Sequence, residues 1–185
     1  MKNYAKMIND TTVRVGEGRF SYVHVWDPQK NEDGSQGKYS TCFLIPKTQT
    51  QSLELCKKAI ETAAQAGAEK NWKGRVPANL KTPLRDGDLE HPEDPAYKGM
   101  MFFNCNNTKR PAVCIYDDDL GAASEAMDED DFYSGCWGAV VVTFFAYDKS
   151  GNRGVGASLG PVIKTRDDER LSGSKISIEE SFGDL

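Results

Sequence analysis

The sequence predicts a mainly β domain, a small and partly open barrel that carries one α-helix and long loops. Three observations lead there: apolar residues alternate with others in five or six segments, one segment has helical periodicity, and glycines recur after residue 130. Glycine in a strand permits the sharp coiling or bulges that a small barrel needs at its corners. These residues are Gly135, Gly138, Gly151, Gly154, Gly156 and Gly160.

The first strand is predicted at Arg19–Trp26, where four aromatic side chains alternate with Ser21, Val23 and Val25. Asp27-Pro28 ends this strand, and the polar run to Gly37 is predicted to be a mobile hairpin loop. The same period of two predicts the remaining strands at Lys38–Ile45, Met100–Cys105, Ala112–Tyr116, Gly135–Tyr147 and Arg153–Thr165.

One helix is predicted between the second and third of these strands. Thr48 and Gln51 have the spacing of a capping box, and Gly67 is a plausible stop. The apolar stripe is narrow, which indicates a helix lying across the edge of a sheet. Residues 71–95, rich in Pro, Gly and charge, are predicted to form a long loop. The stripe consists of Leu53, Cys56, Ile60, Ala63 and Ala64.

Charge is distributed unevenly along the chain. Residues 117–131 contain eight acidic residues and no Lys or Arg, and residues 172–185 carry Glu179, Glu180 and Asp184 against Lys175. Removing the net charges of these two segments, −8 and −2, from the total of −5 leaves the other residues at +5. We therefore predict a basic domain over residues 1–171 and an acidic, disordered tail over residues 172–185. An acidic protein of this design can still bind a polyanion.

No stretch approaches the roughly 18 apolar residues of a membrane span, and the N-terminus lacks a signal core, so a cytoplasmic protein is expected. The five cysteines contain no C-x-x-C pair and lie mostly in apolar patterns, which predicts buried, reduced thiols. No metal site and no cofactor are expected.

The sequence contains only weak matches to enzyme motifs. Gly156–Gly160 spells G-x-S-x-G, but Pro161 and the apolar residues after it continue an extended strand rather than starting a helix. Asp86, Asp88 and the triplet at 117–119 could hold Mg²⁺ as in a nuclease, yet turn and loop roles are favoured because no catalytic spacing is present. The chain also lacks phosphate-loop and dinucleotide fingerprints.

Aromatic residues interleaved with cations indicate a different chemistry. Single-stranded nucleic acid is held by cationic grooves that follow the phosphates and by rings on which the bases stack. An aromatic face could instead fill the barrel, but two strands are apolar on both faces and only one face can be interior. The candidate residues are Arg14, Arg19, Tyr22, Trp26, Lys38, Trp72, Lys73, Arg75, Lys81, Arg85, Lys109, Arg110, Trp137, Phe145, Tyr147, Arg153, Lys164 and Arg166.

For two segments the sequence allows more than one role. Trp72, in the cluster Asn71-Trp72-Lys73-Gly74-Arg75, could stack a base while the cations pair with phosphates, or could anchor the loop to the barrel. The tail could occupy the cationic groove or offer Phe182 to a partner, with Glu179, Glu180 and Asp184 as its acidic groups, or could only solubilise the chain.

The chain resembles a family of bacteriophage single-stranded DNA-binding proteins, a branch formerly of unknown function. The resemblance rests on an ordered set of segments that covers most of the chain: Arg19-Phe20-Ser21-Tyr22, Tyr39–Lys47 ending in Ile-Pro-Lys, Pro83–Asp88, Phe132–Cys136 and Gly151–Val155.

This resemblance implies an OB-fold, a five-stranded, partly open Greek-key barrel, acting in the host cytoplasm in phage DNA replication or recombination. Two features depart from the usual pattern. The predicted helix follows the second strand instead of the third, and Phe182 is followed by Gly183-Asp184-Leu185 instead of ending the chain.

The sequence thus predicts a non-catalytic protein that coats single-stranded DNA without reading its sequence. The alternatives are a Mg²⁺-dependent nuclease and a recombination accessory or interaction module that uses residues 117–131. Expected partners are single-stranded DNA and, through the tail, replication or recombination proteins, with no membrane. The sequence leaves the oligomeric state open, a homodimer included.

Overall fold

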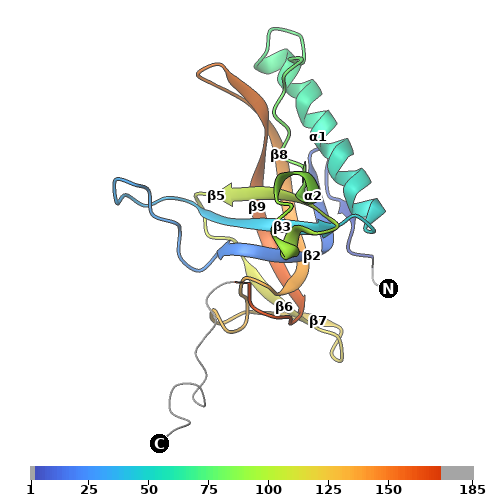
Figure 1. Ribbon diagram of the computed structural model, residues 1–185, viewed down its shortest axis with the longest axis vertical. Helices are drawn as coiled ribbons and strands as arrows, with labels where there is room; N and C mark the ends of the chain where they lie inside the picture. Colours follow the sequence, from blue (N-terminus) through green and yellow to red (C-terminus); the bar gives the residue numbers. More distant parts are fainter. Residues whose placement is uncertain (1–2, 172–185) are drawn as a thin grey trace, which may run out of the picture.

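A computed structural model describes residues 3–171, and the predicted tail with its residues Glu179, Glu180, Phe182 and Asp184 lies outside the described residues. The described part is one nine-stranded sheet with one long helix (Figure 1). The strands are β1 (Lys6–Met7), β2 (Thr12–His24), β3 (Tyr39–Pro46), β4 (Arg85–Asp86), β5 (Met100–Asn107), β6 (Val113–Asp117), β7 (Ala122–Glu125), β8 (Trp137–Lys149) and β9 (Asn152–Arg166). The helices are α1 (Thr50–Lys70), the short α2 (Gly87–Glu90) and the 3₁₀ turn η1 (Pro95–Tyr97).

Five of the strands form the barrel. Antiparallel pairing joins β5 to β3, β3 to β2, β2 to β8 and β8 to β9. A short parallel contact between Asn106 of β5 and Ser158 of β9 closes the ring. This connectivity is the Greek-key OB arrangement that the resemblance implies, and the helix lies between the second and third barrel strands, as the sequence predicts.

The barrel interior is filled by aromatic and branched residues. Phe20 lies 4.8 Å from Phe43 and 4.7 Å from Phe132 between ring centroids, and both pairs are tilted. Phe103 and Phe144, also buried, extend the same cluster toward β8. Tilted and edge-on ring pairs of this kind add to the stability that burial alone gives.

Helix α1 covers one side of the barrel, where it packs against β8 and β2 (Figure 1). All five residues of its predicted stripe are buried. The predicted helix start and stop are wrong: α1 begins at Thr50 without a side-chain cap, and Gly67 lies inside it. Gly67 is needed there because a Cβ would stand 2.3 Å from the Cβ of Ala146 on β8.

Two other segments differ from the prediction. Strand β2 begins at Thr12 rather than at the predicted Arg19. The first part of the strand was missed because Gly16 and Gly18, at a register shift against β8, interrupt the alternation. The acidic segment 117–131 is not only loop: β7 pairs with β6, which in turn runs parallel to β9. This hairpin extends the sheet beyond the barrel at the bottom of Figure 1.

The cysteine prediction is confirmed. All five cysteines are free, four are buried and Cys114 is half-buried. Burial raises the pKa of the Cys42 thiol to about 11 and that of Cys56 to about 12, so both stay protonated and unreactive at neutral pH.

Candidate nucleic-acid interface

A continuous groove crosses the outer face of β3 and β5. It consists of three adjoining hollows that all include Asn106, and it runs from Tyr22 on β2 to Phe145 on β8. Figure 1 shows the connection between β2 and β3 and the hairpin of β8 and β9 projecting from the barrel on two sides. These are the strands and loops with which OB-folds bind oligonucleotides. We call this surface the groove.

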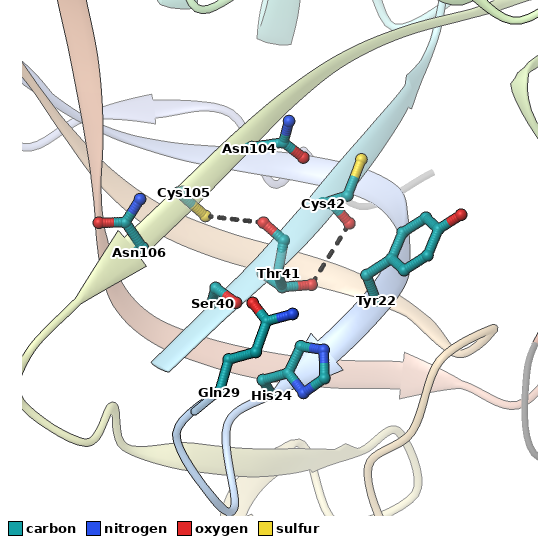
Figure 2. Close-up of a pocket in the computed structure, with 9 residues that line it drawn as sticks. All are labelled: Tyr22, His24, Gln29, Ser40, Thr41, Cys42, Asn104, Cys105 and Asn106. Atoms are coloured by element: carbon teal, nitrogen blue, oxygen red, sulfur yellow. Dashed lines mark hydrogen bonds between the residues drawn. The ribbon is translucent and has the colours of Figure 1, made fainter. Parts of the chain in front are cut away.

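Tyr22 is the aromatic residue at one end of the groove (Figure 2). Its side chain is 62% exposed, whereas Phe20, two residues before it, is fully buried. The alternation breaks because Tyr22 has a φ of 48°, at a register shift between Ser21 and His24. Such a conformation is costly for a bulky residue and is typical of functional sites. The bulge turns the ring outward.

Phe145 and Tyr147 are the aromatic residues at the other end. Each is paired across the hairpin with a glycine of β9, Phe145 with Gly156 and Tyr147 with Gly154. A Cβ on Gly156 would lie 2.7 Å from the Phe145 ring, and one on Gly154 would lie 2.8 Å from Cζ of Tyr147. The rings therefore cover the bare backbone of β9, and the glycines are needed for that contact. Phe145 is still 46% exposed.

Cations border this second end of the groove. Lys38, Lys81 and Lys149 are exposed there, and among residues 3–171 no carboxylate lies within 4 Å of their ammonium groups. Lys81 is placed by its backbone, which donates to Arg153 O at 3.2 Å and accepts from Val155 N at 2.9 Å. Part of the predicted loop 71–95 is thus fixed along the hairpin. Arg85 also lines the groove, 3.3 Å from Glu90 and 4.6 Å above the Phe102 ring.

The floor of the groove is neutral and polar, and sequence reasoning missed it. Figure 2 shows Ser40, Asn104 and Asn106 on neighbouring strands, with Gln29 and His24 beside them. Below them Thr41 donates to Ser21 O at 3.0 Å and Cys105 to Thr41 O at 3.6 Å, which holds the strands together. Alternate residues of a strand face the same side. Asn104 and Asn106 flank the apolar Cys105, and this pattern could have predicted that the two amides face outward together.

Trp72 does not belong to the groove. Its side chain is 3% exposed, and its indole Nε1 donates to Tyr147 O at 3.3 Å. The stacking interpretation of Trp72 is therefore wrong, and the anchoring alternative holds. Lys73 and Arg75, in the same turn, are exposed but line no part of the groove.

A second group of predicted residues forms what we call the closed cluster, where β8 begins and β9 ends. Trp137 donates from Nε1 to Asp168 Oδ2 at 2.8 Å, while the Arg166 guanidinium lies 4.2 Å from its ring centre. Arg19 donates to Gly135 O at 3.0 Å and to Glu169 O at 2.8 Å. These contacts hold residues 167–171 against the barrel, and the Arg166 side chain itself stays exposed.

Lys164 belongs to the same cluster. It is 7% exposed, and its Nζ lies 2.7 Å from Asp167 Oδ1. Tyr133 donates to the same carboxylate at 2.7 Å, and burial raises the pKa of Tyr133 to about 12. The hydrogen bond from Lys164 is the main cause that lowers the pKa of Asp167. Lys164 is therefore a structural ion-pair partner in this conformation and not a free phosphate ligand.

The remaining candidates lie elsewhere. Arg14 donates to Tyr4 O at 2.7 Å beside β1, and Arg153 pairs with Asp148 at 3.1 Å. Lys109 is exposed on the connection between β5 and β6. Trp26 and Arg110 form a separate pocket, described below.

Asp86 and Asp88, two of the carboxylates considered for a nuclease site, are held in structural hydrogen bonds and ion pairs. Lys47 lies 2.8 Å from Asp86 and 2.7 Å from Asp88, and these hydrogen bonds are the main cause that lowers the pKa of both carboxyls. Asp86 also caps α2, and Asp88 accepts from Gly99 N at 3.0 Å. Within residues 3–171 no three His, Cys, Asp or Glu residues are grouped to hold a metal ion. The helices of this described region include none that is long and apolar enough to cross a membrane.

A closed OB barrel with an open aromatic and cationic groove defines a class of oligonucleotide-binding proteins. The chain belongs to the family described as the single-stranded DNA-binding protein of Enterobacter phage Enc34, which matches residues 11–185.

Individual relatives agree with this assignment. The bacteriophage Enc34 protein, solved in complex with single-stranded DNA, is 26% identical, with a TM-score of 0.70 over 91% of this chain and 97% of that one. A putative protein, p50, of Acyrthosiphon pisum secondary endosymbiont phage 1 is 29% identical over 94% of this chain and 93% of its own length. The bacteriophage T7 single-stranded DNA-binding protein gp2.5 shares the fold, with 15% identity and a TM-score of 0.58 over 91% of this chain and 98% of that one.

Proposed function

We propose that this protein binds single-stranded DNA in the groove without reading its sequence, and coats the strand during phage DNA replication or recombination in the cytoplasm of the infected bacterium. The observation that carries the proposal is the pair of exposed aromatic ends, Tyr22 and Phe145, separated by a polar floor and bordered by three lysines that have no carboxylate partner within residues 3–171. Ring faces stack on any base, and lysines neutralise phosphates, so neither contact selects a sequence.

The chain's membership of a phage family of single-stranded DNA-binding proteins supports the same assignment, as does the relative solved with single-stranded DNA. The neutral amides of the floor add hydrogen bonds to base edges. Because an amide both donates and accepts, Asn104 and Asn106 can satisfy every base.

Titration with oligo-dT tests the proposal. Affinity should fall as salt rises, with a log–log slope of about −0.7 for each phosphate neutralised, and a short strand of mixed sequence should bind about as well as a short oligo-dT. Tight binding that depends on sequence and ignores salt would contradict it. A duplex of the same length measures the preference for single strands.

The role is proposed to be non-catalytic. Incubation of the pure protein with labelled DNA and Mg²⁺ should leave the DNA intact. Cleavage that disappears in Asp86→Ala would instead favour the nuclease alternative.

The tail 172–185 is proposed to compete with DNA for the groove. Leu171, the last described residue, packs against a small apolar cluster that includes Cys42, and Cys42 also lines the groove beside Tyr22. Deleting residues 172–185 should raise DNA affinity about twofold at low salt, since a short tether gives a roughly millimolar effective concentration. An unchanged or lower affinity would count against this role and would leave two alternatives for the tail, docking of a partner through Phe182 or solubilisation of the chain alone.

One observation favours a second candidate function, an interaction module that recruits replication or recombination proteins. The acidic segment 117–131 lies beyond the barrel and exposes Leu120 by 78% and Met127 by 79% beside its carboxylates. Neutralising Asp128–Asp131 should then abolish binding to such a partner and leave DNA affinity untouched. Mass measurement in solution with and without DNA would decide whether the partner includes a second copy of the chain.

A further inference from the structure

A smaller pocket lies outside the groove, at the base of the connection between β2 and β3. It is lined by Trp26 just after β2, by the connection between β5 and β6, and by the end of β7. None of its lining residues belongs to the groove. We call it the Trp26 pocket; its residues are Trp26, Arg110, Pro111, Ala112, Val113, Glu125 and Ala126.

The ring of Trp26 is fixed in place and only half-buried. Its indole Nε1 donates to Phe132 O at 2.9 Å, so the polar edge of the ring is satisfied by the core. The Arg110 guanidinium lies 5.4 Å from the ring centre. Arg110 is exposed, and within residues 3–171 it has no carboxylate at ion-pair distance. A positioned ring beside an unpaired guanidinium can stack a base and hold its phosphate.

Glu125 gives this pocket a second chemical property. It ends β7, where it pairs with Cys114, and the next backbone N–H, of Ala126, donates to Val113 O at 2.9 Å. An ionised carboxylate accepts hydrogen bonds and donates none, and it repels phosphate. On this wall it suits the amino group of cytosine, adenine or guanine, and thymine has no such group.

The groove leads to this pocket along two segments of chain. Asn106, shared by all parts of the groove, lies near the end of β5, and Lys109 and Arg110 follow on the connection to β6. The connection is held by Asn107, which donates to Leu159 O at 2.9 Å and accepts from Lys109 N at 3.0 Å. On the other border Gln29, also in the groove, follows Trp26 by three residues.

We propose that the Trp26 pocket is a second base-binding site, occupied by a nucleotide of the strand after it leaves the groove across Lys109 and Arg110. The inference rests on the proposed function and extends it. Strands that fill only the groove do not reach the pocket, whereas longer strands place one base against Trp26. Glu125 gives this one position a bias toward bases that carry an amino group.

Oligonucleotides of increasing length test the site. Binding of oligo-dC should tighten at a threshold length, and Arg110→Ala and Trp26→Phe should remove about three- to tenfold of the affinity above that length and little below it. Trp26→Phe keeps a ring in the core but loses indole stacking area. It should also lose the part of the tryptophan quenching that appears at the threshold. Lys57→Ala, an exposed cation of α1 far in sequence from either site, is the matched control.

The base bias is measured with long oligo-dC against oligo-dT of equal length. The wild type should favour oligo-dC about two- to fivefold, and Glu125→Gln should reduce the difference, since an amide is a weaker acceptor than a carboxylate. Short strands should show no bias.

The outcomes separate the two proposals. If Arg110→Ala and Trp26→Phe match Lys57→Ala at every length, the Trp26 pocket binds no base and the groove proposal stands. If the wild type binds no oligonucleotide at all, the proposed function itself fails. Equal loss at all lengths would place Trp26 within the groove's own footprint and would also overturn a separate second site.

Discussion

The groove and the closed cluster contain the same kinds of side chain and use them in opposite ways. In the groove, Tyr22 and Phe145 are exposed, and Lys38 and Lys81 have no carboxylate partner among the described residues. In the closed cluster, Trp137 is hydrogen-bonded to Asp168 and covered by Arg166. Aromatic rings interleaved with cations therefore do not define a binding surface by themselves.

What separates the two regions is the presence of acids. Asp167 and Asp168 neutralise the cations around them and fix the polar edges of Tyr133 and Trp137. These contacts hold residues 167–171, which follow β9, against the barrel. Neutral amides form the floor of the groove, so Lys38 and Lys81 stay available to phosphate, while Arg85 is paired with Glu90. The comparison can be tested by replacing matched residues on the two sides.

Trp72 should show the largest effect, on stability. It is buried between α1 and β8, and truncating a buried large aromatic residue costs about 3–5 kcal/mol. Trp72→Ala should lower the free energy of unfolding by that order in a denaturant titration. Trp72→Phe should lose far less. A Trp72→Ala protein of normal stability with weakened DNA binding would restore the stacking interpretation.

Removing the exposed rings should change affinity rather than stability. Tyr22→Ala and Phe145→Ala should each weaken oligo-dT binding by about 1–3 kcal/mol, the value of one stacked base. Tyr133→Phe, in the closed cluster, keeps its ring and should leave affinity unchanged. The measurement is a fluorescence or anisotropy titration at fixed salt. An equal loss in Tyr133→Phe would abolish the distinction between the two regions.

The groove lysines that have no carboxylate partner within residues 3–171 should govern the salt dependence of DNA binding. Lys38→Ala combined with Lys81→Ala should make the log–log salt slope shallower by about 1.4, which is 0.7 for each lost phosphate contact. The double variant Lys57→Ala with Lys58→Ala removes the same charge from the exposed face of α1 and is the control. If both double variants change the slope equally, Lys38 and Lys81 contact phosphate no more than the lysines of α1 do.

The acids of the closed cluster should give the smallest effect, a dependence of stability on pH. Backbone and side-chain hydrogen bonds from Glu169 and Trp137 lower the pKa of Asp168, and the hydrogen bond from Lys164 lowers that of Asp167. A lowered pKa means that the stabilisation is complete above the unfolded value, about 3.9, and is lost as pH falls through the folded pKa.

Thermal unfolding should therefore show a decline below about pH 4 that is smaller in Asp168→Asn. Asp10→Asn, an exposed carboxyl outside the cluster, is the control. An identical acid profile in Asp168→Asn and the wild type would show that the cluster contributes no pH-dependent stability.

Most of the fold follows from local pattern. The alternation in residues 39–46 and 137–149 and the stripe of α1 predict elements that the structure contains. The errors lie where a long-range contact overrides local preference. Gly67 reads as a helix stop but permits contact with Ala146, and the weak pattern of β7 becomes a strand only because β6 pairs with it.

The residues of the groove, the candidate site, were predicted in part. Tyr22, Lys38, Lys81, Arg85, Phe145 and Tyr147 were expected from the sequence and are brought together in the groove. Asn104 and Asn106 were missed because polar residues in a strand are usual on any solvent face. Trp137 and Lys164 were expected in the interface, but they bond to Asp168 and Asp167. These two acids follow the last predicted strand, so the strand pattern gave no sign of the contacts.

The sequence by itself determined the barrel, the one long helix, the free thiols and the supply of rings and cations, because burial periods and residue chemistry are local properties. Only the tertiary structure decided which rings are exposed. Tyr22 is turned outward by its positive φ. Phe145 and Tyr147 lie over glycines of β9, and Trp137 is bonded to the carboxylate of Asp168, so these rings are placed by residues of other segments. Whether a ring faces solvent or a partner depends on those contacts, which residue type and spacing do not encode.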